Sequence, residues 1–178
     1  MKILKNVKDS IFWLFETNPI VIKNLQQEAK KRGVKSDRLI FAKRMTLDKH
    51  LARLKVADLF LDTLPYTAHT TSSDALWSGL PIIVHIGQSF QSRVSASLLT
   101  AIELPELITH SEKEYEDLAI KLATNPGQFV KIKNKLKKNR LKTPLFDAKL
   151  FTKNIESAYT IMHEKYLKNL PLENIEIK

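Results

Sequence analysis

Short apolar runs alternate with longer segments of helical periodicity along almost the whole chain, and this alternation restricts the folds that the chain can adopt. The apolar runs that we predict to be strands lie at 11–15, 38–42, 58–62, 81–85 and 106–109. Apolar runs separated by amphipathic helices are typical of βαβ units, in which the strands are parallel. We therefore expect an α/β fold, with a parallel sheet that carries helices on both faces.

Two of the predicted helices have apolar residues at the spacing expected for packing. In the first, over 90–100, the inward residues are predicted to be Val94, Leu98 and Ala101. The second is predicted over 148–166, and its stripe is expected to pack through Phe151, Ile155, Tyr159 and Met162.

The stretch from Ala57 to Pro81 contains the densest group of chemically active side chains. Its apolar run ends at Asp62, a loop follows, and a short helix is predicted to end at Gly79. Between the strand and the helix stand His69, four consecutive hydroxyl residues and Asp74. In an open α/β sheet this position lies at the carboxyl ends of the strands, where ligands bind.

Two interpretations of this helix start are compatible with its residues. In the first, the N–H groups and positive dipole end of the helix bind a phosphate, with the hydroxyls of residues 70–73 around it. Asp74 then accepts from a sugar hydroxyl, and His69 donates to an anion or packs against a ring. In the second, Thr70 or Thr71 caps the helix and Asp74 complements the dipole. Spacing alone favours the second, because capping patterns are common and the stretch has no glycine fingerprint.

A second group of candidate residues lies on the helix predicted to begin at Thr46. His50 stands at the border of the buried face of this helix, and Arg53 follows about one turn later. His50 is either a packed or capping residue or a part of the crevice. Arg53 is either a solvated side chain or a group that reaches a base or a phosphate.

The chain contains three segments in a fixed order, HTTSSDALWSGLPII, GQSFQSRVSASLL and RLKTPLFD. Together they resemble the C-terminal catalytic lobe of the O-GlcNAc transferase and SPINDLY family, and the resemblance extends from about residue 2 to residue 166. It implies a Rossmann-like fold, that of the C-terminal, donor-binding lobe of a two-lobed GT-B glycosyltransferase. It also favours the ligand-binding interpretation of His69 to Asp74.

The resemblance implies a reaction as well as a fold. The donor would be a nucleotide-sugar such as UDP-GlcNAc and the acceptor a protein hydroxyl, with direct displacement at the anomeric carbon and no metal or other cofactor. Asp74 would hold the ribose, His50 would support the nucleoside, and the leaving diphosphate would be stabilised at the helix start. The donor-binding residues expected from the resemblance are His50, Arg53, His69, Thr70, Thr71 and Asp74.

The sequence also departs from the family pattern. A family lysine one turn before the matching histidine is Leu47 here. A strand and loop that carry a donor-contacting glutamine and lysine in the family would lie before Met1. The acceptor-binding lobe and the helical repeats of the family do not match any part of this sequence. We therefore expect a further lobe or a helical-repeat protein as a partner, and whether this chain alone is an enzyme stays open.

The net charge of +10 attracts polyanions as well as nucleotide-sugars. Lysine and arginine residues crowd the predicted helix over 129–141, and the plain interpretation is a solvated basic face. The alternative function is a non-catalytic basic binding module that binds polyanions through Lys131 to Lys142. Because no aromatic residues are interleaved among these lysines, single-stranded nucleic acid is not the expected partner.

The chain has no cysteine, which excludes disulfides and thiolate metal sites. No apolar run approaches the roughly 20 residues needed to span a bilayer, so we expect a cytoplasmic protein without a membrane partner. We predict one nucleotide-sugar-binding lobe over 1–166, incomplete at its N-terminal end, and a tail over 167–178. The donor sugar, the base, the acceptor and the oligomeric state do not follow from the sequence.

Overall fold

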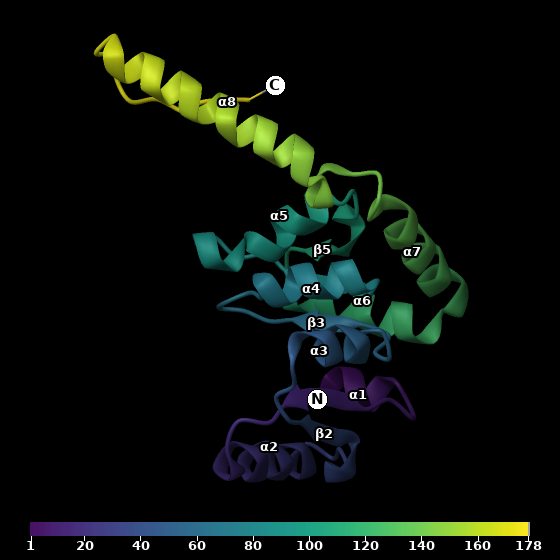
Figure 1. Cartoon of the computed structure of the whole chain (residues 1–178). Helices are drawn as coiled ribbons and strands as arrows, with labels where there is room; N and C mark the ends of the chain where they lie inside the picture. The colour runs from purple at the N-terminus through teal and green to yellow at the C-terminus, as the bar shows by residue number, and fades with distance from the viewer. Residues whose placement is uncertain (178) are drawn as a thin grey trace.

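The computed structural model describes residues 1–177 and has an α/β architecture in which parallel strands are flanked by helices (Figure 1). The strands are β1 (Phe12–Phe15), β2 (Leu39–Ala42), β3 (Phe60–Asp62), β4 (Ile82–His85) and β5 (Ile108–Thr109). The helices are α1 (Lys2–Asn6), α2 (Pro19–Lys31), α3 (Leu47–Leu54), α4 (Thr70–Ser78), α5 (Val94–Ala101), α6 (Glu112–Thr124), α7 (Pro126–Asn139) and α8 (Ala148–Leu167). Every strand pair is parallel, which confirms the predicted fold class.

The strands form two sheets rather than one continuous sheet. β1 pairs with β2, and β3, β4 and β5 pair in that order. Within residues 1–177 no ladder joins β1 to β3. The connection between the sheets is made by α3, which leaves β2 and leads into β3. One side chain of α3, Arg53, lies over the ring of Trp13 in β1, 5.4 Å from its centroid.

The helices pack in two groups. In one group α3 contacts α4 and α4 contacts α5, and in the other α1 contacts α6 and α6 contacts α7. The larger core lies around β4, whose residues Ile82, Ile83 and Val84 are completely buried. Full burial of one such side chain contributes about 1.5–3 kcal/mol. A smaller core of Leu4, Ala29, Val34 and Leu39 joins α1 and α2 to the β1–β2 sheet.

The segment 90–101 differs from the prediction of one regular helix. Residues Phe90–Ser92 form a 3₁₀ turn, and α5 begins after it. The predicted inward residues Val94, Leu98 and Ala101 are half-buried, and Leu98 packs against the larger core. The fully buried residues of α5 are Ser95, Ala96 and Leu99. The predicted strand over 106–109 is likewise shortened to β5 by a 3₁₀ turn over Pro105–Leu107.

The last helix, α8, extends away from the rest of the molecule (Figure 1). It has no buried residue, so the prediction that its apolar stripe packs is wrong for the described part of the chain. From residue 168 to 177 the chain runs back along α8, and Glu173 forms an ion pair with Lys165. Lys178, the last residue of the predicted tail, lies outside the described residues. None of the helices in residues 1–177 is long and apolar enough to cross a membrane.

The loop between β3 and α4 is held from inside by Asp62. This carboxylate is 4% exposed, and its Oδ1 accepts hydrogen bonds from the N–H groups of Thr63 at 3.0 Å and Ala68 at 2.8 Å. Its Oδ2 is buried without a hydrogen-bond partner among the described residues. Burial therefore raises the pKa of Asp62, although the Ser95 hydroxyl and the two N–H groups act in the opposite direction.

The same loop is also attached to α5 and to the segment before it. The Thr67 hydroxyl donates to the carbonyl of Gln91 at 2.6 Å, and the Ser95 hydroxyl donates to the carbonyl of Ala68 at 2.5 Å. The Ser95 hydroxyl also lies 2.7 Å from the Ser72 hydroxyl. These bonds fix the position at which α4 begins.

We expect Asp62→Asn to preserve the conformation of the loop between β3 and α4, and Asp62→Ala to destabilise it. An asparagine Oδ1 can accept both N–H bonds without the cost of burying a charge, whereas alanine leaves two buried donors unpaired, at about 1–3 kcal/mol each. Because the pKa of Asp62 is raised, the folded native chain binds this proton above pH 3.8, where the unfolded chain releases it. Stability of the native chain therefore decreases as the pH rises through that window.

The measurement is the free energy of unfolding in urea from about pH 4 to 7. At pH 7 the free energy of unfolding of Asp62→Asn should equal or exceed that of the native chain. The variant should also lack the decrease in this free energy with rising pH that Asp62 contributes to the native chain. Equal destabilisation of the two variants at pH 7 would show instead that the loop requires the negative charge.

Candidate functional site

The N-terminal end of α4 is not capped by a side chain. His69 is the N-cap residue, and its side chain makes no capping hydrogen bond. The first backbone N–H of the helix that has a hydrogen-bond acceptor is that of Ser73, which donates to the carbonyl of His69 at 3.1 Å. The N–H groups of residues 70–72 have no acceptor among the described residues. The positive end of the helix dipole is therefore available to an anion.

This geometry contradicts the capping interpretation of the helix start. Thr70 and Thr71 lie inside the helix and do not cap it, and α4 has no acidic residue in its first turn. The hydroxyls of both threonines lie at the surface. The carboxylate of Asp74 is half-buried and has no hydrogen-bond or ion-pair partner within residues 1–177. These three side chains are thus free to contact a ligand. Ser72 is not, because its hydroxyl is buried against Ser95.

His69 orders the loop in front of the helix. Its ring stacks on Tyr66, with centroids 4.8 Å apart, and meets the edge of Phe90 at 6.3 Å. Its Nε2 lies 3.2 Å from the carbonyl of Gln91. A carbonyl only accepts, so Nε2 carries the proton, and in the neutral ring Nδ1 remains as an acceptor. Of the two roles predicted for His69, the structure shows ring packing.

His50 and Arg53 lie together on α3. The Arg53 Nη2 is 3.1 Å from His50 Nδ1, and a guanidinium can only donate, so the proton of neutral His50 is on Nε2. Arg53 Nη1 also donates to the carbonyl of Lys43 at 2.9 Å, and the guanidinium lies over Trp13. Arg53 is therefore not a freely solvated side chain. It links α3 to β1 and to the residue that follows β2, and leaves His50 with one N–H donor.

The six predicted residues thus fall into two groups. His69, Thr70, Thr71 and Asp74 share the loop after β3 and the first turns of α4, whereas the pair on α3 follows the end of β2. α3 and α4 pack against each other, but no hydrogen bond or ion pair in residues 1–177 joins the two groups. Both follow carboxyl ends of parallel strands, which is the arrangement of a ligand crevice in this class of sheet.

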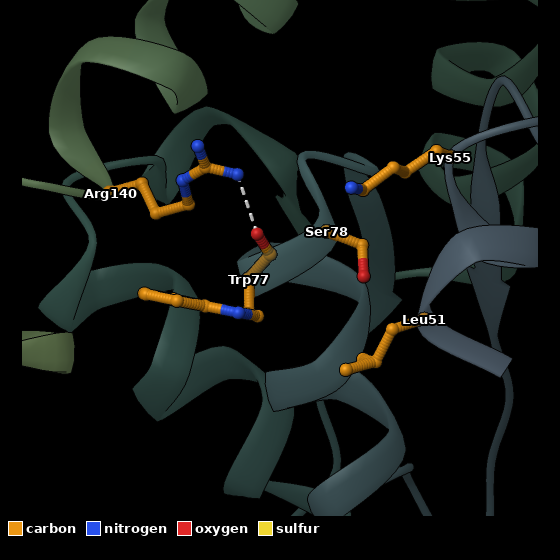
Figure 2. A pocket seen from close by; sticks show the side chains of 5 residues that line it. All are labelled: Leu51, Lys55, Trp77, Ser78 and Arg140. Carbon is orange, nitrogen blue, oxygen red and sulfur yellow. Dashed lines mark hydrogen bonds between the residues drawn. The ribbon is translucent and has the colours of Figure 1, made fainter. Parts of the chain in front are cut away.

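A hollow of about 280 Å³ lies at the opposite end of α4 (Figure 2). Arg140 donates to the carbonyl of Trp77 at 2.6 Å and lies over its ring, 5.5 Å from the centroid. None of the six predicted residues lines this hollow. It belongs to the packing of the segment after α7 on α4 and is separate from the candidate site. Its lining residues are Leu51, Lys55, Trp77, Ser78 and Arg140.

Several cations of the lysine-rich helix are engaged within the protein. Lys133 lies 5.4 Å from the ring centroid of Phe129, Lys135 forms an ion pair with Glu106 at 2.7 Å, and Arg140 is held by Trp77. The other cations between residues 131 and 142 are exposed and form no ion pair in the described part of the chain. This arrangement supports the interpretation of a solvated basic face.

The residues that hold the loop between β3 and α4 in place were not identified from the sequence. Asp62, Thr67, Gln91 and Ser95 hold the loop in place, and only Asp62 has a sequence signal, because it is a charged residue directly after a buried apolar run. The others act through contacts between residues 23 to 27 positions apart, which no local pattern reveals.

Comparison with known proteins places this arrangement in a family. The sequence model of the family described as Glycosyl transferase family 41 matches residues 1–155. The chain is 31% identical over 175 residues to a UDP-N-acetylglucosamine–peptide N-acetylglucosaminyltransferase of Caenorhabditis elegans. The aligned region is 98% of this chain and 15% of the relative. It is 35% identical over 158 residues to a probable enzyme of the same name, SEC, of Arabidopsis thaliana, covering 88% of this chain and 16% of the relative.

A solved structure shares the fold over most of the chain. The structure of a Thermobaculum terrenum O-GlcNAc transferase mutant superposes with a TM-score of 0.84 at 32% identity, covering 90% of this chain and 32% of that one. The chain therefore corresponds to a part of these proteins, about 15% of the length of the two curated relatives. Since the family model matches most of its residues, this chain belongs to glycosyl transferase family 41.

Proposed function

We propose that residues 1–166 form the donor-binding lobe of a glycosyltransferase that uses UDP-GlcNAc and transfers the sugar to protein hydroxyls, with the residues from 167 on as a tail. The observation that carries the proposal is the uncapped start of α4, with free N–H groups, two free threonine hydroxyls and an unpaired carboxylate one turn on. The names of the relatives state the same donor and a peptide acceptor for those proteins.

The start of α4 is suited to the diphosphate of the donor. Three unpaired N–H groups point out of the helix end, and the hydroxyls of Thr70 and Thr71 supply further donors. A phosphate at this place gains both the hydrogen bonds and the helix dipole. Asp74 is a poor neighbour for phosphate but a good acceptor for ribose hydroxyls. In this proposal the N-terminal end of α4 binds the diphosphate of the nucleotide, and the carboxylate of Asp74 binds its ribose.

His50 and Arg53 complete the proposed site from α3. The Nε2–H of His50 is a single donor in a fixed tautomer, because Arg53 holds Nδ1. It is suited to an oxygen acceptor of the nucleoside. Arg53 contributes by fixing His50, because two of its N–H groups are directed at His50 and at the carbonyl of Lys43. His69 contributes by keeping the loop packed against Tyr66.

The reaction that follows is a displacement at the anomeric carbon. The acceptor hydroxyl oxygen forms a bond to this carbon and releases its proton to solvent, the bond from the carbon to the diphosphate oxygen breaks, and UDP leaves with the electron pair. Negative charge grows on the leaving diphosphate in the transition state. The fixed N–H groups of α4 stabilise that charge without reorganisation, which is preorganised electrostatic catalysis.

Titration calorimetry with UDP, UDP-GlcNAc and GDP at moderate salt tests the site. We expect one of these nucleotides to bind, and Asp74→Ala to weaken it about 10- to 100-fold, the effect of losing a hydrogen bond to a charged group. The matched control is Asp58→Ala. It removes an exposed carboxylate two residues before β3 begins and changes the net charge equally. Equal affinities of the two variants would contradict a ribose contact by Asp74.

We expect nucleotide binding without a divalent metal, since the helix end supplies the positive charge that a metal would supply in other transferases. The affinity for UDP should be the same in excess EDTA and in excess Mg²⁺. A large gain in affinity with Mg²⁺ would contradict a metal-independent site.

The basic face of α7 and the residues after it should not contribute to nucleotide binding. Replacing Lys131, Lys137, Lys138 and Lys142 by glutamine removes exposed cations and leaves the engaged ones in place. We expect the UDP affinity of this variant to stay within about threefold of the native value at physiological salt, where surface charges are screened. If binding to heparin, with a steep salt dependence, were the main activity lost, the basic binding module would be favoured instead.

A further inference from the structure

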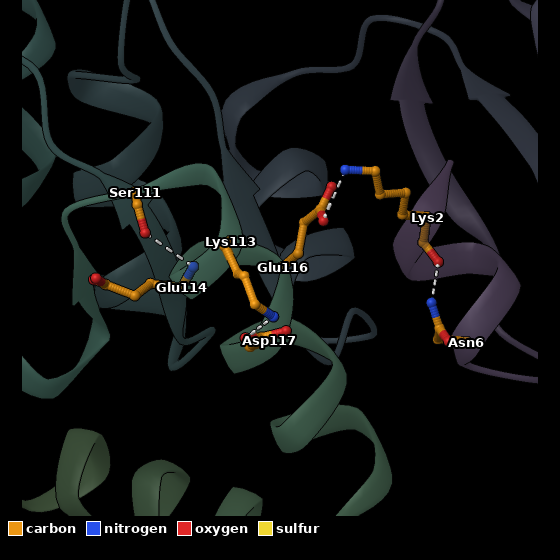
Figure 3. A network of polar contacts seen from close by, with 7 residues as sticks. All are labelled: Lys2, Asn6, Ser111, Lys113, Glu114, Glu116 and Asp117. Atoms are coloured by element: carbon orange, nitrogen blue, oxygen red, sulfur yellow. Dashed lines mark hydrogen bonds and ion pairs between the residues drawn. The ribbon is translucent and has the colours of Figure 1, made fainter.

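Two cations face each other across the hollow at the C-terminal end of α4. Lys55 and Arg140 both line this hollow, and Figure 2 shows their nitrogen atoms directed into it from opposite sides. Neither side chain forms an ion pair within residues 1–177, and none of the described lining residues is acidic. Lys2, by contrast, pairs with Glu116 at 3.3 Å (Figure 3). Because like charges repel, an anion placed between Lys55 and Arg140 is attracted by both.

Arg140 is held in place before any ligand binds. Its Nη1 donates to the carbonyl of Trp77 at 2.6 Å, and the guanidinium lies 5.5 Å from the centroid of the Trp77 ring. Its Nε is buried and has no hydrogen-bond partner among the described residues. The guanidinium therefore keeps donor capacity in a fixed position, which lowers the entropy cost of binding. Lys55, which is exposed, is the mobile half of the pair.

The hydroxyl of Ser78 adds a further donor at the hollow. Ser78 is one of the lining residues and is only 9% exposed, yet its Oγ makes no hydrogen bond within residues 1–177. A serine inside a helix often donates to the carbonyl four residues earlier, and most buried hydroxyls have a partner. Lys55, Arg140 and Ser78 can all donate, so the polar side of the hollow is complementary to an oxyanion.

The negative end of the α4 dipole does not prevent an anion from binding there, because the last carbonyls of the helix already have donors. The N–H of Gly79 bonds the carbonyl of Leu76 at 3.1 Å, and the N–H of Leu80 bonds that of Ala75 at 2.9 Å. Arg140 occupies the carbonyl of Trp77. The two positive charges therefore outweigh the partial charge of this helix end.

The remaining walls of the hollow are apolar and restrict the class of anion. The ring of Trp77 is 47% exposed, and Leu51 is half-buried. The volume of about 280 Å³ is just below the roughly 300–1,000 Å³ of pockets for drug-sized ligands. Phosphate is polar on every side and would leave oxygen atoms unpaired against these walls. A carboxylate on a small, flat apolar body matches both the cations and the walls.

We propose that the hollow is a binding site for a small carboxylate, with the carboxylate group between Lys55 and Arg140 and its apolar body against Trp77 and Leu51. We refer to it as the carboxylate site. It shares no residue with the candidate nucleotide site. Leu51 lies in α3 and Lys55 is the C-cap of that helix, so the ligand joins α3 to α4 and stabilises the folded chain by mass action.

NMR titration with benzoate tests the carboxylate site. The chain has two tryptophans, so the indole N–H of Trp77 reports on the hollow and that of Trp13, in β1, is an internal reference. We expect benzoate to shift the Trp77 signal with saturation at about millimolar concentration and to leave the Trp13 signal unchanged. Benzamide has the same shape without the charge and should bind about fivefold more weakly. Inorganic phosphate should also bind more weakly than benzoate.

Three variants separate recognition from folding. Lys55→Gln should weaken benzoate binding about fivefold, whereas Lys49→Gln, which replaces an exposed lysine of α3 that does not line the hollow, should have no effect. Ser78→Ala should weaken benzoate binding too. Because it removes a buried hydroxyl without a partner, it should not lower the free energy of unfolding measured without ligand. A purely structural role of Ser78 would lower that free energy and leave benzoate binding unchanged.

Several outcomes would overturn the proposal. These are the absence of a saturable shift at Trp77, equal binding of benzoate and benzamide, equal affinities of Lys55→Gln and Lys49→Gln, and tighter binding of phosphate than of benzoate. Displacement of benzoate by UDP would place the nucleotide in the hollow and would contradict both the carboxylate site and the proposed function. Saturable benzoate binding by a chain that binds no nucleotide would support the carboxylate site and contradict only the proposed function.

Discussion

The requirement that backbone N–H and C=O groups find partners governs this structure, and the places where it is not met within the described chain are the informative ones. The N–H groups at the start of α4 have no acceptor there, and β1 and β3 each keep one open edge. A helix start that opens to solvent costs little, because water satisfies it. In the proposed function an anion replaces the water, and it would lie at the carboxyl end of β3, where ligands bind in open α/β sheets.

A fixed helix start requires a rigid loop, and the loop before α4 is held by hydrogen bonds to the buried side chain of Asp62. Asp62 accepts two N–H bonds from its own loop while its second oxygen has no partner among the described residues. Burial of a carboxylate is unfavourable, so its position has to be compensated by the two N–H bonds and by the hydroxyl contacts of Thr67 and Ser95. Glycine is needed at one point of this support: a Cβ on Gly87 would lie 2.4 Å from the Ser92 hydroxyl oxygen.

The sequence was sufficient for the strands and most helices, because apolar periodicity and stop signals such as Gly79, which is the left-handed C-cap of α4, are local. It failed where the answer depends on distant residues. Periodicity shows that α8 is amphipathic but cannot show whether a partner covers its stripe, and Phe151 is 66% exposed. The split between the two sheets depends on which strands pair, which is a long-range property. The same holds at the site: the residue types around Asp74 could be predicted, whereas the bonds that make Ser72 unavailable and that direct Arg53 toward His50 could not.

The strong positive charge of the chain and its proposed anion site are separate features. Arg140, where the basic segment approaches α4, contacts Trp77 near the C-terminal end of that helix. Seven residues separate Trp77 from Thr70, which corresponds to about 10 Å along the helix axis. The screening length at physiological ionic strength is about 8 Å, so the lysines of the basic segment contribute to the long-range field that attracts anions but little to the energy at the helix start. Binding strength at that point has to come from hydrogen bonds to fixed N–H groups and hydroxyls, which act at short range and are weakened less by salt than long-range charge attraction is. If the proposed site binds a diphosphate, its selectivity against other polyanions would therefore reside in geometry rather than in net charge.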